Sequence, residues 1–409
     1  MNPLYNFGMH FFKAAASVAA LGGGKPQRMV KGQAHTFQHL QRHLHPQGGY
    51  VWFHVASLGE FEQARPLIEL LRRERPHEKI LLSFFSPSGY EVRKDYDQVD
   101  AVCYLPIDTP ANARRFVHLV KPRMAIFVKY EFWGNYLETL HKRQVPTFII
   151  ACILRPGQVF FKPWGGMFRR MLRCFTTMLV QNDDTRQLLH GIGIDNVVVA
   201  GDTRYDRVAA VKAAARSFPV IEEFVAGAPQ VLVMGSSWQP DEDIVLPYFN
   251  THPQLKLIIA PHEFDEQRLA ALQRKITRPV ARYSQLQEGQ SAGLDCIIID
   301  CFGLLSSLYR YGTIAQVGGG FGSGIHNINE AAAHGIPVLF GPRHEKFQEA
   351  HELLACGGGF TFSDAGQFAA HMDRLLGDHE ALRRAGDAAA RHIAAHTGAT
   401  RLIYDHIFA

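Results

Sequence analysis

The chain has 409 residues, of which 47% are hydrophobic and 20% are charged. This composition is typical of a folded globular protein and excludes a disordered chain, and the length favours two domains over one core. The six cysteines include no C-x-x-C pair, which argues against a disulfide framework and against a cysteine zinc site. We therefore expect reduced, buried thiols.

The net charge of +5 is concentrated at the start of the chain. No Asp or Glu precedes Glu60, and five basic residues in this part account for the whole excess: Lys13, Lys25, Arg28, Lys31 and Arg42. Residues 5–21 are largely apolar, but they are too short and too polar for a confident membrane span. We predict that residues 1–45 form a leader that associates with an anionic membrane surface. The alternative is a basic tail without a partner.

From residue 50 onward, short apolar runs alternate with amphipathic helical stretches. Because the runs are continuously apolar, they favour parallel strands that are covered on both faces. The predicted strands lie at residues 51–55, 80–85, 101–105, 124–128, 147–152, 177–180 and 197–200, and then at residues 231–234, 257–260, 297–299, 314–317 and 338–340.

The two sets of strands predict an α/β protein with two Rossmann-like domains that face each other across a cleft. The domains are expected at residues 46–205 and 230–385, and the Ala-rich segment at residues 206–229 is the expected linker. A C-terminal helix at residues 386–409 is expected to pack back against the first domain. Ligands are expected at the carboxyl ends of the parallel strands.

Two carboxylates follow strand ends in the first domain. The first strand leads into Ser57 and then Glu60 at a helix start, and the strand from residue 124 leads into Lys129 and Glu131. Parallel strands end at one edge of a sheet, so we expect Glu60 and Glu131 to converge there. A carboxylate at a helix N-terminus can accept a proton from a substrate. The alternative for Glu60 is a purely capping role.

Residues 161–172 combine aromatic and aliphatic side chains at helical spacing with Lys162, Arg169 and Arg170. Such a stripe usually belongs to the core. The alternative is a contact with a lipid that carries phosphates, because basic side chains bind phosphate.

In the second domain, the strand at residues 314–317 enters a glycine-rich loop that opens into a helix at about residue 328. Glycines allow the backbone to approach a ligand, and free N–H groups at a helix start favour a phosphate. We therefore predict a nucleotide site, in which Glu330 accepts hydrogen bonds from ribose hydroxyls. The loop residues expected to contribute are Gly322, Ser323, Gly324, His326 and Asn327. The alternative is an ordinary glycine-rich corner.

Three further strand ends of the second domain carry polar or flexible residues. Ser236 and Ser237 are placed to hold a phosphate, His262 is expected at the same cleft, and Gly303 belongs to a loop that could bind a base. The three acids at residues 241–243 are explained better by the dipole of a helix start than by a metal site.

Five segments, in order between about residues 50 and 345, together resemble the 3-deoxy-D-manno-octulosonic acid (Kdo) transferases of Gram-negative bacteria. The series is more specific than any one segment. The segments are residues 56–60 (ASLGE), 129–133 (KYEFW), 201–207 (GDTRYDR), 235–238 (GSSW) and 324–327 (GIHN).

The resemblance implies the two-domain GT-B fold and an inverting transfer of Kdo from CMP-Kdo to a lipid A precursor. The expected place is the cytoplasmic face of the bacterial inner membrane, with peripheral or monotopic attachment and no nucleic-acid partner. Glu60 matches the family's catalytic base and Glu131 its second essential acid, while residues 235–237 and 322–330 match its CMP-binding elements. We expect no cofactor and no metal ion. The leaving group, CMP, has a single phosphate, and its negative charge needs less neutralisation by a metal than that of a diphosphate.

Two departures from the family pattern fall near the expected site. The family usually has Pro-Arg-His where this chain has Pro-His-Glu at residues 261–263, so His262 stands where an arginine is expected. The family's Asn-Ala-Arg appears as Ala-Cys-Ile at residues 151–153, and Arg155 follows shortly afterwards. Arg155 is therefore a candidate for acceptor binding.

Two other functions fit part of the pattern. One is a GT-B transferase or epimerase that uses a UDP-sugar, and the other is a non-enzymatic protein that binds a nucleotide or a lipid. The acid-free basic leader argues against a soluble epimerase, and the two converging carboxylates argue against a protein that only binds.

Overall fold

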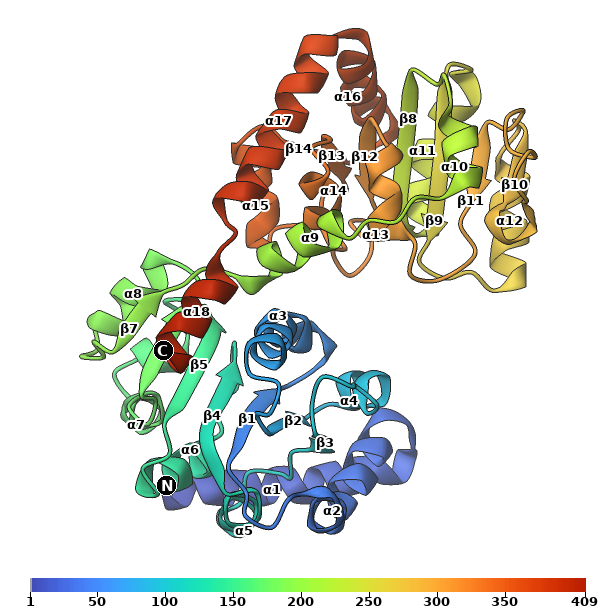
Figure 1. Ribbon diagram of the computed structural model, residues 1–409. Coiled ribbons are helices and arrows are strands. Elements are labelled where there is room, and N and C mark those ends of the chain that lie inside the picture. The colour runs from blue at the N-terminus through green and yellow to red at the C-terminus, as the bar shows by residue number, and fades with distance from the viewer. Residues whose placement is uncertain (1) are drawn as a thin grey trace. The chain divides into compact units, whose positions relative to one another are not determined.

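The computed structural model describes residues 2–409 and divides into two compact units. Unit 1 comprises Met1–Asp206 and Thr397–Ala409, and unit 2 comprises Arg207–His396. Within the described residues, each unit has one seven-stranded sheet whose paired strands are parallel, with helices packed around it (Figure 1). The predicted α/β architecture of two Rossmann-like domains is confirmed, whereas the separate leader and linker boundaries remain predictions.

The sheet of unit 1 has the strand order β3-β2-β1-β4-β5-β6-β7. Its order reverses between β1 and β4, which is where open α/β sheets bind ligands. The strands are β1 (Tyr50–Val55), β2 (Ile80–Phe84), β3 (Ala101–Tyr104), β4 (Pro122–Val128), β5 (Thr147–Cys152), β6 (Thr177–Val180) and β7 (Val197–Val199).

The helices of unit 1 connect these strands and cover the sheet. They are α3 (Leu58–Glu74), α4 (Pro87–Arg93), α5 (Pro110–Val120), α6 (Gly134–Lys142), η2 (Val159–Phe161), α7 (Gly166–Leu172), α8 (Asp183–His190) and α18 (Ala399–Phe408), and in α9 (Thr203–Ala213) the chain passes into unit 2. Strand β1 is buried along its whole length, because Trp52 faces one core cluster while Val51 and Phe53 face another. This two-sided burial is why the strands have continuously apolar sequences.

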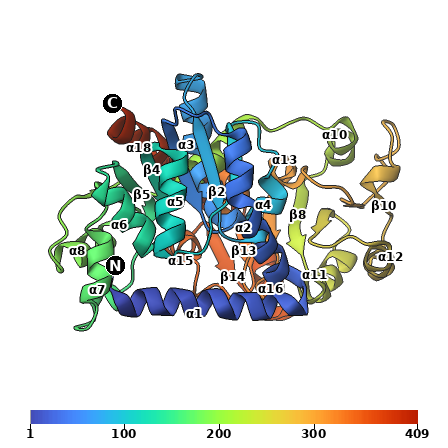
Figure 2. The ribbon, with the colours of Figure 1, turned by 90° about the horizontal axis from the view of Figure 1, so that it is seen from below.

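The leader folds into two helices, α1 (Pro3–Ala19) and α2 (Gly24–His43), which are joined by η1 (Ala20–Gly22). Helix α2 is part of unit 1, since Leu40 is fully buried and the Thr36 hydroxyl donates to Tyr104 O over 3.0 Å. Helix α1 runs along the outside of the unit (Figure 2). No helix within residues 2–409 is long and apolar enough to cross a membrane.

Helix α18 packs against unit 1, whereas residues 386–395 belong to α17 in unit 2, so the segment predicted as one helix at residues 386–409 forms parts of two helices. Ile403 and Phe408 belong to the same core cluster as Leu67 and Leu71 of α3. Asp206 holds the start of this helix, because its carboxylate accepts hydrogen bonds from Gly398 N (2.6 Å) and Thr400 N (2.7 Å).

The sheet of unit 2 has the order β10-β11-β9-β8-β12-β13-β14 and reverses between β8 and β12. Its strands are β8 (Gln230–Ser237), β9 (Leu255–Pro261), β10 (Val280–Arg282), β11 (Cys296–Ile298), β12 (Ile314–Val317), β13 (Val338–Phe340) and β14 (Gly359–Thr361). The sequence prediction missed β10 and β14, because each is a three-residue edge strand that is only partly buried.

The helices of unit 2 alternate with its strands over most of the unit. They are α10 (Pro219–Val225), α11 (Gln239–Thr251), α12 (Glu266–Lys275), η3 (Tyr283–Gln285), α13 (Leu305–Leu308), η4 (Tyr309–Tyr311), α14 (Ile328–Ala333), α15 (Gln348–Ala355), α16 (Ala365–Gly377) and α17 (His379–Ala395).

Candidate active site

Two acid-bearing loops lie side by side at the switch point of unit 1. Strands β1 and β4 are hydrogen-bonded neighbours, with His54 opposite Phe127. The chain leaves β1 towards Glu60 and leaves β4 towards Glu131. The parallel register therefore brings the two loops to the same edge of the sheet, as the sequence predicts.

Glu60 sits in the first turn of α3 and caps that helix. Its Oε2 accepts hydrogen bonds from Ser57 N (3.1 Å) and from the Ser57 hydroxyl. The capping interpretation is confirmed, and the side chain remains partly exposed. Capping also fixes the carboxylate at the loop edge, so it does not exclude a role in proton transfer.

Glu131 is a buried carboxylate that two ring N–H groups hold in place. Its Oε2 lies 2.8 Å from His54 Nε2 and accepts a hydrogen bond from Trp133 Nε1 over 2.7 Å. An ionised carboxylate only accepts hydrogen bonds, so this contact assigns a proton to Nε2 of His54. On the other side of the ring, Nδ1 lies 2.9 Å from the hydroxyl of Ser83. The arrangement fixes a negative charge at the end of β4.

The backbone is strained where β4 and β5 end. Lys129 has a φ of 63° and Ala151 a φ of 51°, which place both residues in the left-handed region. At Ala151 the pairing of β5 with β6 also shifts register, between Ile149 and Cys152. Such strain and bulges gather at functional sites, where they change the direction of side chains.

The Tyr130 hydroxyl lies close enough to Glu60, Arg155 and Arg204 for their charges to act on it. Burial raises the pKa of this hydroxyl, Cys152 and Glu60 raise it further, and the positive charges of Arg155 and Arg204 oppose this rise. Glu60, Arg155 and Arg204 therefore share one electrostatic environment around Tyr130. The ammonium of Lys129 lies 5.5 Å from the centre of the same ring.

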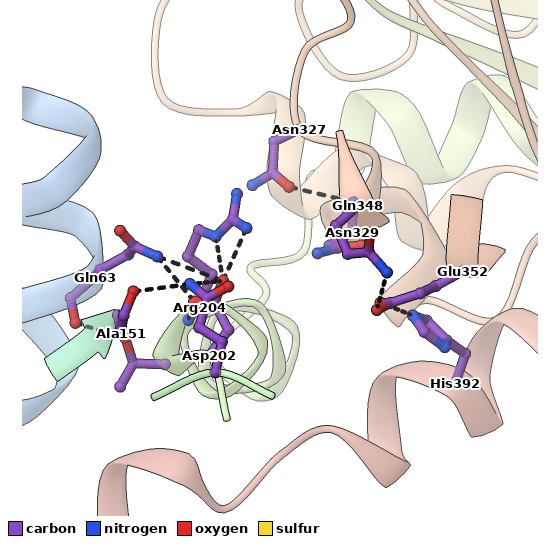
Figure 3. Close-up of polar contacts among 11 residues, drawn as sticks. Gln63, Ala151, Asp202, Arg204, Asn327, Asn329, Gln348, Glu352 and His392 are labelled. Carbon is purple, nitrogen blue, oxygen red and sulfur yellow. Dashed lines mark hydrogen bonds and ion pairs between the residues drawn. The ribbon is translucent and has the colours of Figure 1, made fainter. Parts of the chain in front are cut away.

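The sequence prediction did not include Arg204 among the site residues. Its Nε and Nη2 each lie 2.8 Å from Oδ2 of the buried Asp202, and Gln63 Nε2 donates to Oδ1 over 3.2 Å (Figure 3). Burial alone would raise the pKa of Asp202, but the Arg204 charge and the hydrogen bonds lower it. An Asp and an Arg two residues apart, shortly after the apolar strand β7, were the available signal.

The basic side chains at residues 161–172 contact this segment's own backbone or lie beside the start of the leader. The guanidinium of Arg169 donates to Phe160 O (3.1 Å) and Lys162 O (3.0 Å), which closes the turn before α7. Arg170 lines a hollow of about 470 Å³ together with Pro3 and residues of α6. Much of the apolar stripe is core, because Met171 and Leu172 are buried.

Helix α1 is fastened to the loops through Tyr5. The Tyr5 hydroxyl donates to Asp108 Oδ2 over 2.6 Å and accepts from Gly134 N over 3.1 Å. Asp108 also accepts from Asn135 N (2.9 Å) and Tyr136 N (3.0 Å) at the start of α6. Burial raises the pKa of Asp108 to about 6, although these hydrogen bonds oppose the rise.

A chain of aromatic rings joins α1 to Glu131. Phe12 stacks on Phe85 at a centroid distance of 6.3 Å, and Phe85 packs on Trp133 at 4.6 Å. Trp133 is the indole that donates to Glu131. The leader helix is therefore packed against the acid-bearing loop.

The outer face of α1 and the following turn is apolar and exposed. Large exposed apolar patches mark interaction sites, because a soluble chain rarely leaves them in water. The side chains and their exposed fractions are Leu4 (76%), Phe7 (73%), Phe11 (68%), Val18 (67%) and Leu21 (86%). We call these five residues the leader face.

In unit 2, the glycine-rich loop begins at the switch point between β8 and β12. Gly235 lies opposite Val317, and Gly318 N donates to Gly235 O over 2.9 Å. A Cβ on Gly318 would lie 2.3 Å from Ser236 O, so this close approach requires glycine. Ser236 has a φ of 52° and coincides with a register shift between β8 and β9.

Two acids of the 241–243 run hold these loops together, in line with a structural role. Asp241 accepts from Trp238 N (2.9 Å) and from Gly319 N (3.1 Å), and burial raises its pKa. The Ser237 hydroxyl donates to Glu242 Oε1 over 2.9 Å, and Glu242 also pairs with Arg268.

His262, Trp238 and His326 form an aromatic stack beside the glycine-rich loop. The His262 ring lies 4.6 Å from the Trp238 ring and 4.4 Å from the His326 ring. Trp238 Nε1 donates to His326 Nε2 over 3.0 Å, which leaves Nδ1 as the protonated nitrogen of a neutral ring. Burial and the neighbouring His262 lower the pKa of His326, which favours this neutral form.

The other residues predicted to bind the donor lie either between β12 and the first turn of α14 or in the loop after β11. Asn327 donates to Glu330 Oε1 over 3.0 Å at the start of α14, and Arg343 donates to Gly322 O over 2.6 Å, which holds the exposed tip that includes Ser323. Gly324, with a φ of 136°, lies in the same loop. Gly303 is exposed in the loop after β11, and β9 separates that strand from β8.

Comparison with known proteins gives one family. The family described as "3-Deoxy-D-manno-octulosonic-acid transferase (kdotransferase)" matches residues 27–207, which contain the acid loops and Arg204. The 3-deoxy-D-manno-octulosonic acid transferase of Aquifex aeolicus is 28% identical over 80% of this chain and 86% of its own length. Over most of its length the chain is therefore similar to proteins of the Kdo transferase family. The Bordetella pertussis member is 27% identical over 88% of this chain and 87% of its own length.

Solved structures agree on the fold. UDP-GlcNAc 2-epimerase from Neisseria meningitidis has a TM-score of 0.60 at 15% identity, covering 87% of this chain and 98% of the other. MurG from Acinetobacter baumannii has a TM-score of 0.56 at 14% identity, covering 88% and 99%. These likenesses confirm the predicted GT-B fold.

Proposed function

We propose that the protein is an inverting glycosyltransferase that moves Kdo from CMP-Kdo to a lipid A precursor. The observation that carries the proposal is the pair of carboxylates, Glu60 and Glu131, on adjacent loops at the β1–β4 switch point. Both lie inside the segment that matches the family, and the matched relatives are named as Kdo transferases.

Glu60 is the proposed general base. It takes the proton from an acceptor hydroxyl, and the hydroxyl oxygen then forms a bond to the anomeric carbon of Kdo. The bond from that carbon to the CMP phosphate oxygen breaks, and CMP leaves with the bonding electrons. A single displacement of this kind inverts the anomeric configuration. The partly exposed position of Glu60 and its fixed orientation by Ser57 support this role.

Glu131 is proposed to act by its charge. Glycosyl transfer passes through a transition state with positive charge on the sugar ring, which a fixed carboxylate stabilises. The buried contacts with His54 and Trp133 suit this role better than proton transfer, because they hold Oε2 in place. Lys129, Arg155 and Arg204 supply positive charge nearby, and they suit the acceptor's phosphates or the carboxylate of Kdo.

The donor nucleotide is proposed to bind unit 2 at the β8–β12 switch point. The glycine-rich loop offers backbone N–H groups, and the neutral His326 offers its Nδ1 proton. Ser236 and Ser237 line the end of β8, His262 adds a stacked ring, and Glu330 is proposed to accept from the ribose hydroxyls. A single phosphate leaving group is stabilised by such donors alone, so the mechanism requires no metal.

The acceptor is proposed to reach unit 1 from an anionic membrane surface, at the cytoplasmic face of the bacterial inner membrane. The leader face offers apolar side chains, and the five basic residues of the leader are exposed on α1 and α2. Trp164 is 74% exposed just before α7, and Arg170, Lys142 and Arg173 line the hollow at the start of α1. Lys162 and Arg169 are proposed to shape this acceptor side.

The deciding experiment incubates the protein with CMP-Kdo and a tetraacylated lipid A precursor, and then weighs the lipid by mass spectrometry. A mass gain of one or more Kdo residues is expected. Calorimetry with CMP and UMP provides the second arm, and CMP is expected to bind more tightly. Failure of transfer together with preference for UMP would favour a UDP-sugar enzyme instead.

A further inference from the structure

A histidine and glutamate cluster lies in unit 2 between α15 and α17. His392 and His396 are four residues apart at the C-terminal end of α17, so they share one face, and Glu352 faces them from α15. One ligand atom from each of the three residues can be chosen so that all lie within 4.8 Å of one another. The carboxylate of Glu352 and the ring of His392 point toward each other (Figure 3).

The orientation of each group suits a metal ion. His396 Nδ1 donates to His392 O over 2.8 Å, which leaves the lone pair on Nε2. His392 Nε2 lies 3.7 Å from Glu352 Oε2, while Gln348 donates to the other carboxylate oxygen over 3.1 Å. Such outer hydrogen bonds commonly fix the tautomer and orientation of metal ligands. His392 is only 8% exposed, so its ring is held in place by the surrounding packing.

The chain contains a matched histidine pair without the carboxylate. His39 and His43 on α2 are also four residues apart, and their ring centroids lie 4.3 Å apart, as do those of His392 and His396. The Nδ1 of His43 likewise lies 2.8 Å from the carbonyl of His39. Among the described residues, only the Glu352 cluster brings three such ligand groups together.

We propose that Glu352, His392 and His396 bind one divalent transition-metal ion of the Zn²⁺ class. Two imidazoles and one carboxylate are a donor set that zinc uses in proteins, with a water molecule as the fourth ligand. The ion would join α15 to the last turn of α17, the point at which the chain leaves unit 2. Because a folded chain binds the ion and an unfolded chain does so weakly, binding stabilises unit 2.

The test is zinc binding by the full-length protein after treatment with a chelator. Zn²⁺ is added in competition with a chromophoric chelator, and the unfolding temperature is followed with and without the ion. The variants are Glu352→Gln, which keeps the size of the side chain, and His396→Gln, which changes an exposed ring. His43→Gln is the control, because it alters the matched pair on α2.

We expect the parent and H43Q to bind one Zn²⁺ per chain and to unfold at a higher temperature with zinc. E352Q and H396Q should bind at least 10- to 100-fold more weakly, since loss of an outer hydrogen-bond partner alone costs that much. All four proteins should unfold at similar temperatures in the chelator, which shows that the variants are folded. Equal zinc affinity in the parent and in E352Q would overturn the proposal, and so would a loss caused equally by H43Q.

Discussion

The two units present different groups at the corresponding switch points of their sheets. In unit 1, the loops after β1 and β4 present charged side chains, Glu60 and Glu131, that their neighbours hold in fixed positions. In unit 2, the loops after β8 and β12 present closely packed backbone around Gly318. This difference is the basis of the proposed division, in which unit 1 activates the acceptor and unit 2 holds the phosphate.

Each unit also anchors its loops with a buried aspartate. Asp108 accepts from the backbone at the start of α6 and from Tyr5 of the leader, and Asp241 accepts from the backbone of both loops at the β8–β12 switch point. The two sites are therefore fixed by similar means, although only the anchor of unit 1 reaches the leader. The proposed division between acceptor and donor units can be tested by changing one side at a time.

The largest effect is expected from neutralising the five basic residues of the leader to glutamine. Each basic residue near an anionic membrane contributes about 1 kcal/mol at low salt, and salt weakens the attraction. Sedimentation with anionic vesicles should fall sharply, and transfer to membrane-embedded acceptor should slow. Transfer to detergent-dispersed acceptor and binding of CMP should change little.

The matched control neutralises five exposed basic residues of unit 2, so that the net charge falls equally: Arg274, Lys346, Arg383, Arg384 and Arg391. This control should still sediment with vesicles. If the leader variant sediments as the parent does, or if both variants lose binding alike, the leader is not the electrostatic anchor.

Glu60→Gln should lower turnover by about 100-fold or more, the scale of a lost general base. Glutamine still offers an oxygen to Ser57 N, so the helix cap is kept while proton transfer is lost. Glu62→Gln on the same helix is the control and should retain turnover. Steady-state kinetics with saturating CMP-Kdo measure both, and near-normal turnover in E60Q would exclude the proposed base.

Gly318→Ala should weaken CMP binding, because the new Cβ would lie 2.3 Å from Ser236 O. The loop must shift to relieve this contact. Loss of one hydrogen bond to the phosphate would then cost roughly 1–3 kcal/mol, which corresponds to about 5- to 150-fold in the dissociation constant. Gly377→Ala, at the end of α16 and outside the proposed site, is the control, since a Cβ there would meet no atom within 4 Å. Calorimetry should give a higher dissociation constant for CMP in G318A than in the control. Equal values would show that the nucleotide does not bind at this loop.

Glu330→Ala should have a smaller effect, towards the lower end of roughly 1–3 kcal/mol, because one hydrogen-bonded partner is removed from an otherwise intact loop. Glu330→Gln keeps an acceptor oxygen and should restore part of the affinity for CMP. Deoxycytidine monophosphate lacks one ribose hydroxyl and should bind both variants with similar affinity. An unchanged CMP affinity in E330A would contradict the proposed ribose contact.

Hydrophobic patterning was sufficient to predict the whole first sheet and the five inner strands of the second. Strands buried on two faces have continuously apolar sequences, and β1 and β12 were found for this reason. The acid loops were located because polar residues directly follow such strands. The short edge strands β10 and β14 were missed, since partly exposed three-residue segments carry little pattern.

The sequence by itself determined which residues follow strand ends, because a buried strand requires a run of apolar residues and the first polar residues mark its end. Only the tertiary structure decided their partners. His54 lies inside a buried strand and its sequence context predicts core, yet its ring contacts Glu131. Gln63 of α3 donates to Asp202, and Glu352 faces His392 from another helix. Such contacts join segments that are distant along the chain, and packing rather than local periodicity sets them.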